Sequence, residues 1–377
     1  MMRVYLDNAA TTPIAQEVID TMLPILKNEF GNPSSSHFNG RQSKALLETA
    51  RRTIAKKLNC TPAEIIFTSG GTEADNMAIH IAVQNLGVKH IITSEIEHHA
   101  VGHTISNLPN KEDLKISYVS LDSKGNVDLE HLKSLLALNL PTLVSLMHAN
   151  NEIGTLLPLD RVSEMCQQYG AYFHSDTVQT VGHIPIDLQS TKIDFITCAA
   201  HKLHGPKGIG FLYTNKRIQS VAFIQGGSQE RGLRGGTENL YGICGMAKAV
   251  ELACDHLHEH AQQVQEIKQY MMDELQKAIP GTYFHGETAP EKSLYTVLNC
   301  SFPSHHNASM LLFSLDLKGV ACSGGSACTS GANQGSHVLK GIGADLSRPN
   351  VRFSFSRYTT KDEIDYAIIQ LIDHYSK

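Results

Sequence analysis

A lysine that stands behind a histidine and ahead of a Gly-Pro break has the clearest chemical potential in this sequence. Lys202 follows His201, precedes Gly205-Pro206 and comes just after the apolar run 193–198. A lysine amine that is held in a dry, positively biased pocket becomes a good nucleophile toward aldehydes. Pyridoxal phosphate (PLP) is tethered to proteins by this chemistry. A solvated surface lysine is the simpler alternative, so the neighbouring motifs must decide between the two.

A glycine-rich turn is a candidate site for the phosphate of such a cofactor. Residues 69–72 (Ser-Gly-Gly-Thr) follow the apolar run 64–68 and open a helical pattern. Glycines let backbone N–H groups approach an anion, and a helix N-terminus adds partial positive charge. Thr72 would supply a hydroxyl, although a plain helix cap would also explain the turn. The absence of a GxGxxG pattern or a Gly-Lys-Ser/Thr loop disfavours a nucleotide-binding module.

Three polar side chains near other apolar runs could contact the ring of the same cofactor. Asp176 follows the run 171–174 and could pair with a pyridinium nitrogen, which keeps the ring able to accept electrons. Capping of the next helix is the alternative role for this aspartate. Gln179 could hydrogen-bond the phenolic oxygen of the ring. His98 follows the run 90–93 and could stack on the ring and exchange protons, although a lone histidine is more often structural.

An arginine inside an apolar run is the best candidate for binding a substrate carboxylate. Arg352 lies within Val-Arg-Phe-Ser at 351–354. A guanidinium can hold a carboxylate through two parallel hydrogen bonds. A charge pair within a sheet is the alternative, and Arg357 is a weaker candidate for the same role.

Metal sites and disulfides find little support in the sequence. His99 and His103, like His256 and His260, have the spacing of metal ligands, but no third ligand is near either pair, so we expect no metal. The eight cysteines are scattered and form no CxxC pair. They suit a reducing compartment in which thiols stay free.

Composition and charge exclude several classes of function. The chain has 377 residues, of which 18% are charged, and a net charge of −5, which argues against non-specific nucleic-acid binding and against a polybasic membrane patch. Asp7 falls where the apolar core of a signal peptide would be needed. No apolar run approaches the roughly 20 residues that cross a bilayer. We therefore expect a cytoplasmic protein without a membrane or direct nucleic-acid partner.

Apolar runs alternate with amphipathic stretches from about residue 60 to 215. Buried strands are expected at 64–68, 90–93, 116–119, 142–146, 171–174 and 195–197, with helical patterns such as 159–169 between them. This alternation predicts an α/β fold with a mostly parallel sheet covered on both faces. Ligands of such sheets collect at the carboxyl ends of the strands, where the polar motifs above are placed.

The pattern changes to long helices and later strands in the C-terminal third. Helices are expected at 247–258 and 261–278, and strands at 295–299 and 351–355. We therefore place a domain boundary near residue 255. Residues 322–335 are almost all small and predict a mobile loop. A flexible linker is the alternative, but the two cysteines of this stretch, Cys322 and Cys328, count against it.

Taken together, these residues resemble the fold-type I PLP enzymes, and specifically the NifS/IscS-type cysteine desulfurases. The resemblance runs from Tyr-Leu-Asp-Asn-Ala-Ala-Thr-Thr-Pro at 5–13 to about Tyr366, and includes 30–35, 68–76, 147–154, 201–202 and 229–237. Its most diagnostic part is Ser-Gly-Gly-Ser-Ala-Cys-Thr-Ser at 323–330, which is similar to the long cysteine loop of one subgroup. The second subgroup carries a shorter, different motif there.

The resemblance implies a PLP-dependent transferase fold of type I with two domains. A mostly parallel seven-stranded sheet would form the large PLP-binding domain over 15–255. Residues 1–14 and 256–377 would form a smaller α+β domain that carries the cysteine loop at about 322–335.

The resemblance also implies a role for each candidate residue. Lys202 would bind the PLP aldehyde as a Schiff base, and the other cofactor contacts would be Gly71, Thr72, His98, Asp176, Gln179 and His201. Asn151 and Arg352 would bind the substrate carboxylate. Thr237 would reach the phosphate of the neighbouring subunit, which implies a homodimer. Cys328 would be the nucleophile, with Lys202 and His98 moving protons, and Cys322 ranks well below it as a spare acceptor.

The implied activity is cysteine desulfuration. L-cysteine would be converted to L-alanine, and its sulfur would form a persulfide on Cys328 and then pass to an acceptor protein. An iron–sulfur scaffold or a tRNA-thiolation protein would fit as the acceptor, and nothing in the sequence distinguishes them.

Two other functions remain open at this level. Transamination or selenocysteine cleavage would use Lys202 and Asp176 without needing Cys328. A non-enzymatic assembly partner gains slight support from Ala199, because the family commonly has a phosphate-binding serine at this position.

Overall fold

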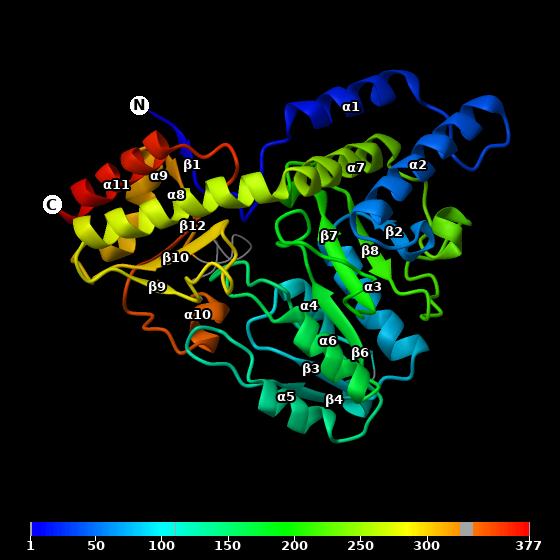
Figure 1. The fold of residues 1–377 in the computed structure, drawn as a ribbon, viewed down its shortest axis with the longest axis horizontal. Helices are drawn as coiled ribbons and strands as arrows, with labels where there is room; N and C mark the ends of the chain where they lie inside the picture. The colour runs from blue at the N-terminus through cyan, green and yellow to red at the C-terminus, as the bar shows by residue number, and fades with distance from the viewer. Residues whose placement is uncertain (1, 110, 325–334, 377) are drawn as a thin grey trace.

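The computed structural model describes residues 2–109, 111–324 and 335–376. The larger part of the chain is built on one seven-stranded sheet (Figure 1). Its strands, in spatial order, are β2 (Ile65–Thr68), β8 (Gly210–Thr214), β7 (Phe195–Ala199), β6 (Tyr172–Asp176), β5 (Thr142–Ser145), β3 (His90–Thr93) and β4 (Lys115–Tyr118). The predicted α/β fold with a mostly parallel seven-stranded sheet is confirmed.

Strand β8 departs from the parallel arrangement that the alternation of strands and helices predicted. It pairs antiparallel with both β2 and β7. The reason is the connection between β7 and β8, which contains no crossover helix. A short connection can join only antiparallel neighbours, whereas a parallel pair needs a crossover of a dozen residues or more. Strand β8 was not among the expected strands, although Lys202 lies on the connection that leads to it.

Helices cover the sheet and extend beyond it. Those that alternate with the strands are α3 (Gly71–Asn85), α4 (His99–Ser106), α5 (Leu129–Leu136) and α6 (Leu159–Gln168). A second group, α1 (Gln16–Asn28), α2 (Phe38–Lys57) and α7 (Leu240–Asp255), packs together with α7 in contact with both others (Figure 1). Apolar side chains of these three helices and of the sheet form the largest hydrophobic core.

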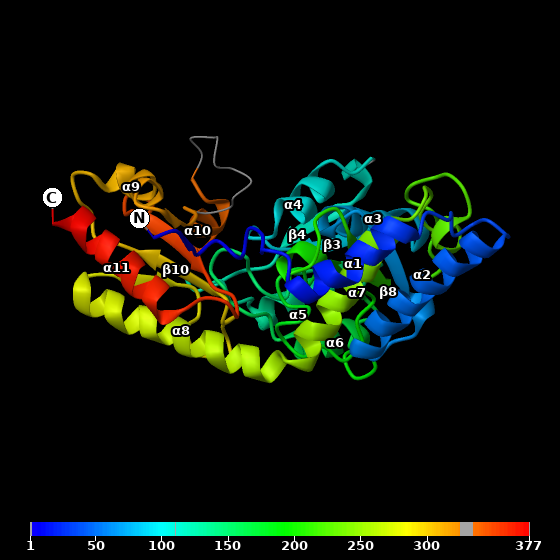
Figure 2. The ribbon, with the colours of Figure 1, turned by 90° about the horizontal axis from the view of Figure 1, so that it is seen from above.

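The remaining elements gather around a smaller sheet at the other end of the molecule (Figure 2). Strands β9 (Tyr283–His285), β10 (Val297–Ser301) and β12 (Asn350–Ser354) are antiparallel, with β10 in the middle. The N-terminal strand β1 (Val4–Tyr5) pairs parallel with β11 (Val320–Ala321). The helices are α8 (Leu257–Ala278), α9 (Leu311–Leu317), α10 (His337–Gly341) and α11 (Lys361–Tyr375).

A second hydrophobic core lies within this smaller part. It includes Phe302 and Phe353 beside apolar side chains of α8 and α11, and it is separate from the core on the large sheet. The helix break lies at His256, between α7 and α8, rather than at the position near 259 that the two expected helices implied. The boundary near residue 255, with parts 15–255 and 1–14 plus 256–377, stays a prediction.

The helices vary in length and in apolar character. In the part of the chain that the structure describes, none combines the length and the apolar character that a bilayer crossing requires.

Candidate active site

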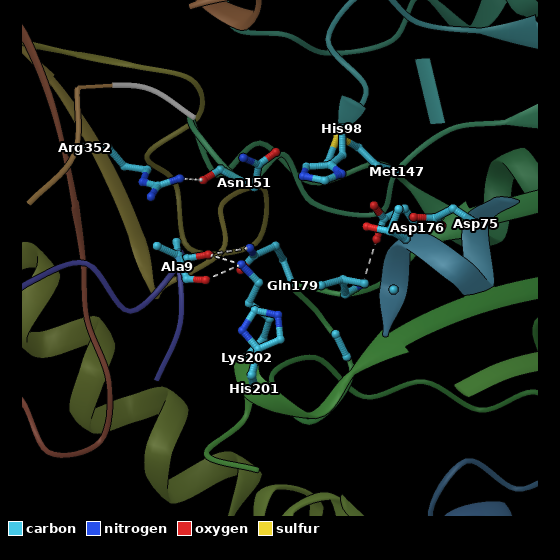
Figure 3. A pocket seen from close by; sticks show the side chains of 15 residues that line it. Ala9, Asp75, His98, Met147, Asn151, Asp176, Gln179, His201, Lys202 and Arg352 are labelled. Atoms are coloured by element: carbon cyan, nitrogen blue, oxygen red, sulfur yellow. Dashed lines mark hydrogen bonds between the residues drawn. The ribbon is translucent and has the colours of Figure 1, made fainter. Parts of the chain in front are cut away.

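A cavity of about 210 Å³ lies where the strands of the large sheet end (Figure 3). Nine of the predicted site residues line it: Gly71, Thr72, His98, Asn151, Asp176, Gln179, His201, Lys202 and Arg352. They come from loops that follow β2, β3, β5, β6 and β7, and from β12 of the smaller sheet. The carboxyl ends of these strands meet at one edge, which is why residues far apart in the sequence share one cavity.

Lys202 is fixed at one side of this cavity by backbone carbonyls. Strand β7 ends at Ala199, and the 3₁₀ turn Ala200–Lys202 follows it directly. The Nζ of Lys202 donates hydrogen bonds to the carbonyl oxygens of Ala9 at 2.5 Å and Ala10 at 2.8 Å (Figure 3). The side chain therefore points into the cavity, and the alternative of a solvated surface lysine does not fit the structure.

The N-terminal segment forms a wall of the cavity, a role that was not among the expectations from the sequence. The Ala9 carbonyl also accepts a hydrogen bond from Gln179 Nε2 at 3.1 Å, and Thr11 Oγ1 lies 3.2 Å from His201 Nδ1. Asp7 Oδ1 accepts a hydrogen bond from Arg352 at 2.8 Å. The run of small and polar residues at 5–13 could have indicated this wall, but it was used only as part of the family resemblance.

The glycine-rich turn has the shape and the charge that an anion requires. Gly71 is the first residue of α3, so backbone N–H groups of the helix N-terminus face the cavity. A Cβ added at Gly71 would lie 2.6 Å from Cγ2 of Val178, so only glycine fits there. Burial lowers the pKa of His201 to about 4, assisted by the charges of Lys202 and Lys207. The imidazole is therefore neutral near pH 7 and can donate a hydrogen bond to a phosphate.

Asp176 and His98 belong to the opposite side of the cavity (Figure 3). Asp176 is the last residue of β6, and its Oδ1 accepts a hydrogen bond from the N–H of Val178 at 2.9 Å. His98 caps α4, and its Nδ1 accepts from the N–H of Ala100 at 3.1 Å. No helix follows β6 before β7, so the helix-capping alternative for Asp176 is wrong, and its contact with Val178 belongs to a turn. The structural role considered for His98 is present together with its position in the cavity.

The cap also determines which nitrogen of His98 carries the proton. Since Nδ1 accepts a hydrogen bond, the proton of the neutral ring is on Nε2. Burial lowers the pKa of His98, Asp176 opposes this shift, and the charge of Lys202 reinforces it. The ring is therefore available as a neutral proton carrier in the same cavity as Lys202.

Arg352 is buried on β12 with part of its hydrogen-bonding capacity unused. Its Nη1 donates to the carbonyl of Asn151 at 3.0 Å, and its Nη2 donates to Asp7 Oδ1 at 2.8 Å. The side chain is 1% exposed, and among the described residues its Nε has no hydrogen-bond partner. A buried guanidinium with an unpaired donor at the cavity is suited to a carboxylate ligand.

Two predicted residues are not in this cavity. Thr237 lies in a different cavity of about 240 Å³ with Arg234 and Glu238. Its contact with the cofactor of a neighbouring subunit stays a prediction. Cys328 lies outside the described residues. Burial and the nearby carboxylates of Asp7 and Asp316 raise the pKa of Cys322 to about 12, which makes this thiol a poor nucleophile.

In both histidine pairs with metal-ligand spacing the two rings lie near each other, and one pair is stacked. The rings of His99 and His103 stack with centroids 4.6 Å apart, and those of His256 and His260 lie 5.6 Å apart. Within residues 2–109, 111–324 and 335–376, no three His, Cys, Asp or Glu side chains are arranged to hold a metal ion.

Nearly the whole chain matches the model of a known protein family. The family model described as aminotransferase class-V matches residues 4–367. The chain belongs to the class-V aminotransferase family. Class-V aminotransferases depend on PLP, so the family accounts for a lysine, an anion cradle and an aspartate around one cavity.

Individual class-V relatives are similar over nearly the whole chain. Cysteine desulfurase IscS of Dictyoglomus turgidum is 44% identical over 370 residues, which cover 97% of this chain and 92% of that protein. A solved NifS-like protein has a TM-score of 0.90 and 35% identity, with all of both chains covered. SspA, solved in complex with cysteine, has a TM-score of 0.79 and 30% identity, covering 95% of this chain and 100% of that chain. The resemblance to NifS/IscS proteins and the fold it implied are confirmed.

Ala199 offers a test of the phosphate side of the cavity. It is buried at the end of β7, and a Cβ at Gly71 would lie 3.7 Å from the Cβ of Ala199. A serine hydroxyl would add a hydrogen bond to a charged group, worth about 1.5–3 kcal/mol. We expect Ala199→Ser to bind PLP about tenfold more tightly or better in a fluorescence titration of PLP-free protein. An equal gain in Ala200→Ser, where the methyl group packs in the core, would contradict this.

Proposed function

We propose that this protein is a PLP-dependent cysteine desulfurase, which converts L-cysteine to L-alanine and transfers the sulfur to one of its own cysteines. The observation that carries the proposal is one cavity that holds Lys202, Asp176 and His98 together with Arg352. The first three suit an aldehyde cofactor with a protonated ring, and Arg352 suits the carboxylate of an amino acid. The names of the similar proteins support cysteine as that amino acid.

The residues of the cavity fit PLP. The N-terminus of α3 at Gly71 and Thr72, with His201, would hold the phosphate, since these residues line the cavity and a helix N-terminus favours an anion. Asp176 would pair with the ring nitrogen and Lys202 with the aldehyde. Bound there, PLP would supply an electron sink that weakens bonds at the substrate carbons.

The protein's own side chains would orient the substrate and move its protons. Arg352 and Asn151 lie together across the cavity from Lys202 and would fix the carboxylate of L-cysteine (Figure 3). Lys202 and His98 would carry protons between the substrate carbons, because both line the cavity and the Nε2 of His98 holds its proton.

The sulfur transfer needs a thiolate and no external oxidant. Cys328 would attack the sulfur of the substrate as a thiolate, since the thiol is a poor nucleophile. The carbon–sulfur bond breaks, a sulfur–sulfur bond forms, and the electron pair of the broken bond takes up a proton to complete the methyl group of alanine. The products are alanine and a persulfide on Cys328. The assignment of Cys328 rests on the sequence motif at 323–330.

A second copy of the chain and a sulfur acceptor complete the proposal. The residues Ile19, Leu23 and Leu26 repeat along one face of α1 and are exposed in the single chain, followed by Phe30 at 84% exposure. An exposed apolar face of this kind supports a homodimer. In that dimer Thr237 would reach the partner's phosphate. We infer an acceptor protein, either an iron–sulfur scaffold or a tRNA-thiolation protein, and a cytoplasmic location.

Arg352→Lys tests the substrate side of the proposal. A lysine keeps the charge but loses the planar fork, so we expect the KM for L-cysteine to rise about tenfold to 100-fold, measured by alanine production with a reductant present. Arg357→Lys, the weaker candidate, should leave KM unchanged because Arg357 lines another cavity. Wild-type protein that released no alanine and sulfide from L-cysteine would disprove the desulfurase function.

A further inference from the structure

A second carboxylate shares the cavity with Asp176. Asp75 lies on α3 and is 1% exposed, and Asp176 lies at the end of β6 and is 6% exposed; both line the cavity (Figure 3). Thr197 on β7 acts on both carboxylates, since its hydroxyl is 3.5 Å from Asp176 Oδ1 and lowers the pKa of Asp75. Two carboxylates in one enclosed site cannot both ionise without a large cost.

His174 lies on the other side of Asp75 and supplies no positive charge to balance an ionised carboxylate there. His174 Nε2 lies 3.4 Å from Asp75 Oδ1, and His174 Nδ1 is 2.8 Å from the hydroxyl of Ser145. Among the described residues, neither Asp75 Oδ1 nor His174 Nε2 has a well-aligned hydrogen-bond partner. Burial lowers the pKa of His174 to about 3, so this ring is neutral at working pH.

The charges that act on Asp75 are those of carboxylates, while the cations Lys202 and Arg352 lie on the far side of the same cavity (Figure 3). Burial raises the pKa of Asp75 well above its usual value, and the charges of Asp176 and Glu97 raise it further, against the hydrogen bond from Thr197. Strands β2 and β8 also pack against α3. Their one titratable side chain, Tyr213, is 3.5 Å from Glu64 instead. His98 faces Asp176 from the start of α4.

We propose that Asp75 is a positioning residue that keeps a proton at neutral pH and so leaves Asp176 as the ionised carboxylate that faces the cofactor. The pair then carries one negative charge, which matches the single positive charge of a protonated pyridine ring. Asp75 acts through Asp176 and Thr197 and does not itself pair with the ring. The proposal rests on the PLP site of the proposed function and adds the protonation state of that site.

Infrared spectroscopy of the full-length protein, as purified and after removal of PLP, tests the proton directly. At pH 7 the wild type should show a protonated-carboxyl band that is reduced in Asp75→Asn. Glu97→Gln is the matched control, because burial raises the pKa of Glu97 to about 8 and its band must be subtracted. A wild-type spectrum identical to that of Asp75→Asn would overturn the proposal.

The pH dependence of unfolding gives a second, independent measurement. A carboxyl group with a raised pKa in the folded state contributes its full stability below its unfolded pKa, and this contribution is lost as pH rises toward the folded pKa. Between about pH 5 and 8, the folding equilibrium constant of the PLP-free wild type should therefore fall up to tenfold more per pH unit than that of Asp75→Asn. Equal slopes would mean that Asp75 is already ionised, which contradicts the proposal.

The two aspartates should also differ in their effect on the cofactor. Asparagine imitates a protonated aspartate, so Asp75→Asn should change PLP affinity at pH 7 less than about threefold, whereas Asp176→Asn should weaken it tenfold or more. If Asp75→Asn does not fold, Thr197→Val removes the hydroxyl that favours ionisation and should shift the transition of Asp75 to higher pH. Similar losses in both aspartate variants would overturn the proposal. None of these measurements involves cysteine turnover, so a failure of the desulfurase function would be seen separately.

Discussion

Lys202→Ala is expected to abolish covalent retention of PLP and to lower alanine formation from L-cysteine by roughly 10⁴-fold. The amine has two functions in the proposed site, since it holds the cofactor and carries a proton, and both are lost together. Its position at the end of β7, beside the carbonyls of Ala9 and Ala10, places it at the wall of the cavity. Borohydride reduction of the purified wild type, followed by peptide mapping, should attach the pyridoxyl group to Lys202.

Lys207→Ala is the matched control for this experiment. Lys207 belongs to the same connection between β7 and β8, but its side chain is exposed. This variant should keep both the cofactor and at least most of the activity. A pyridoxyl label on any peptide without Lys202, or full activity of Lys202→Ala, would contradict the proposed site.

Cys328→Ala should stop persulfide formation and reduce sulfide release by roughly 10³-fold or more, because the loss of a catalytic nucleophile leaves only binding and acid–base effects. The visible absorbance of bound PLP should stay unchanged, since the residues proposed to hold the cofactor are all kept. Mass spectrometry after feeding with L-cysteine should locate one additional sulfur atom on Cys328 in the wild type and none in the variant.

Cys322→Ser distinguishes the two cysteines of this region. Cys322 packs beside the second hydrophobic core, and burial raises the pKa of its thiol to about 12. We therefore expect this variant to retain its sulfide release. A sulfur adduct on Cys322, or normal sulfide release by Cys328→Ala, would show that Cys328 is not the acceptor.

The central part of the fold follows from local patterns. The expected strand at 90–93 is present with the same bounds, and the other five predicted strands of the large sheet differ from the observed ones by a few residues at their ends. Apolar runs separated by helical stretches favour a mostly parallel sheet, because the crossover helices cover both of its faces. Strand β8 was not predicted. No helical stretch separates it from β7, so it does not follow the alternation of strands and helices that identified the other strands.

Asp7 and Asp75 were not predicted as site residues, because their places in the site depend on contacts with residues that are distant in the sequence. Asp7 contacts Arg352 across almost the entire sequence, and nothing in the local pattern around either residue indicates this pair. Asp75 lies in the first turns of α3, where an acidic residue is common and favourable near the positive helix end. Its burial beside Asp176 results from the packing of α3 on β6 and β7.

The sequence by itself determined which chemistry this protein carries: the lysine, the glycine-rich turn, the aspartate and the arginine were all recognisable from residue type and position after an apolar run. These signals are local, because a strand and the polar loop after it are encoded in neighbouring residues. Only the tertiary structure decided how the N-terminal segment closes the cavity, which hydrogen bonds hold Lys202 and Arg352, and that two carboxylates share one site. Such features depend on the packing of segments that are distant in the chain, and packing also sets the burial that shifts the pKa of Asp75.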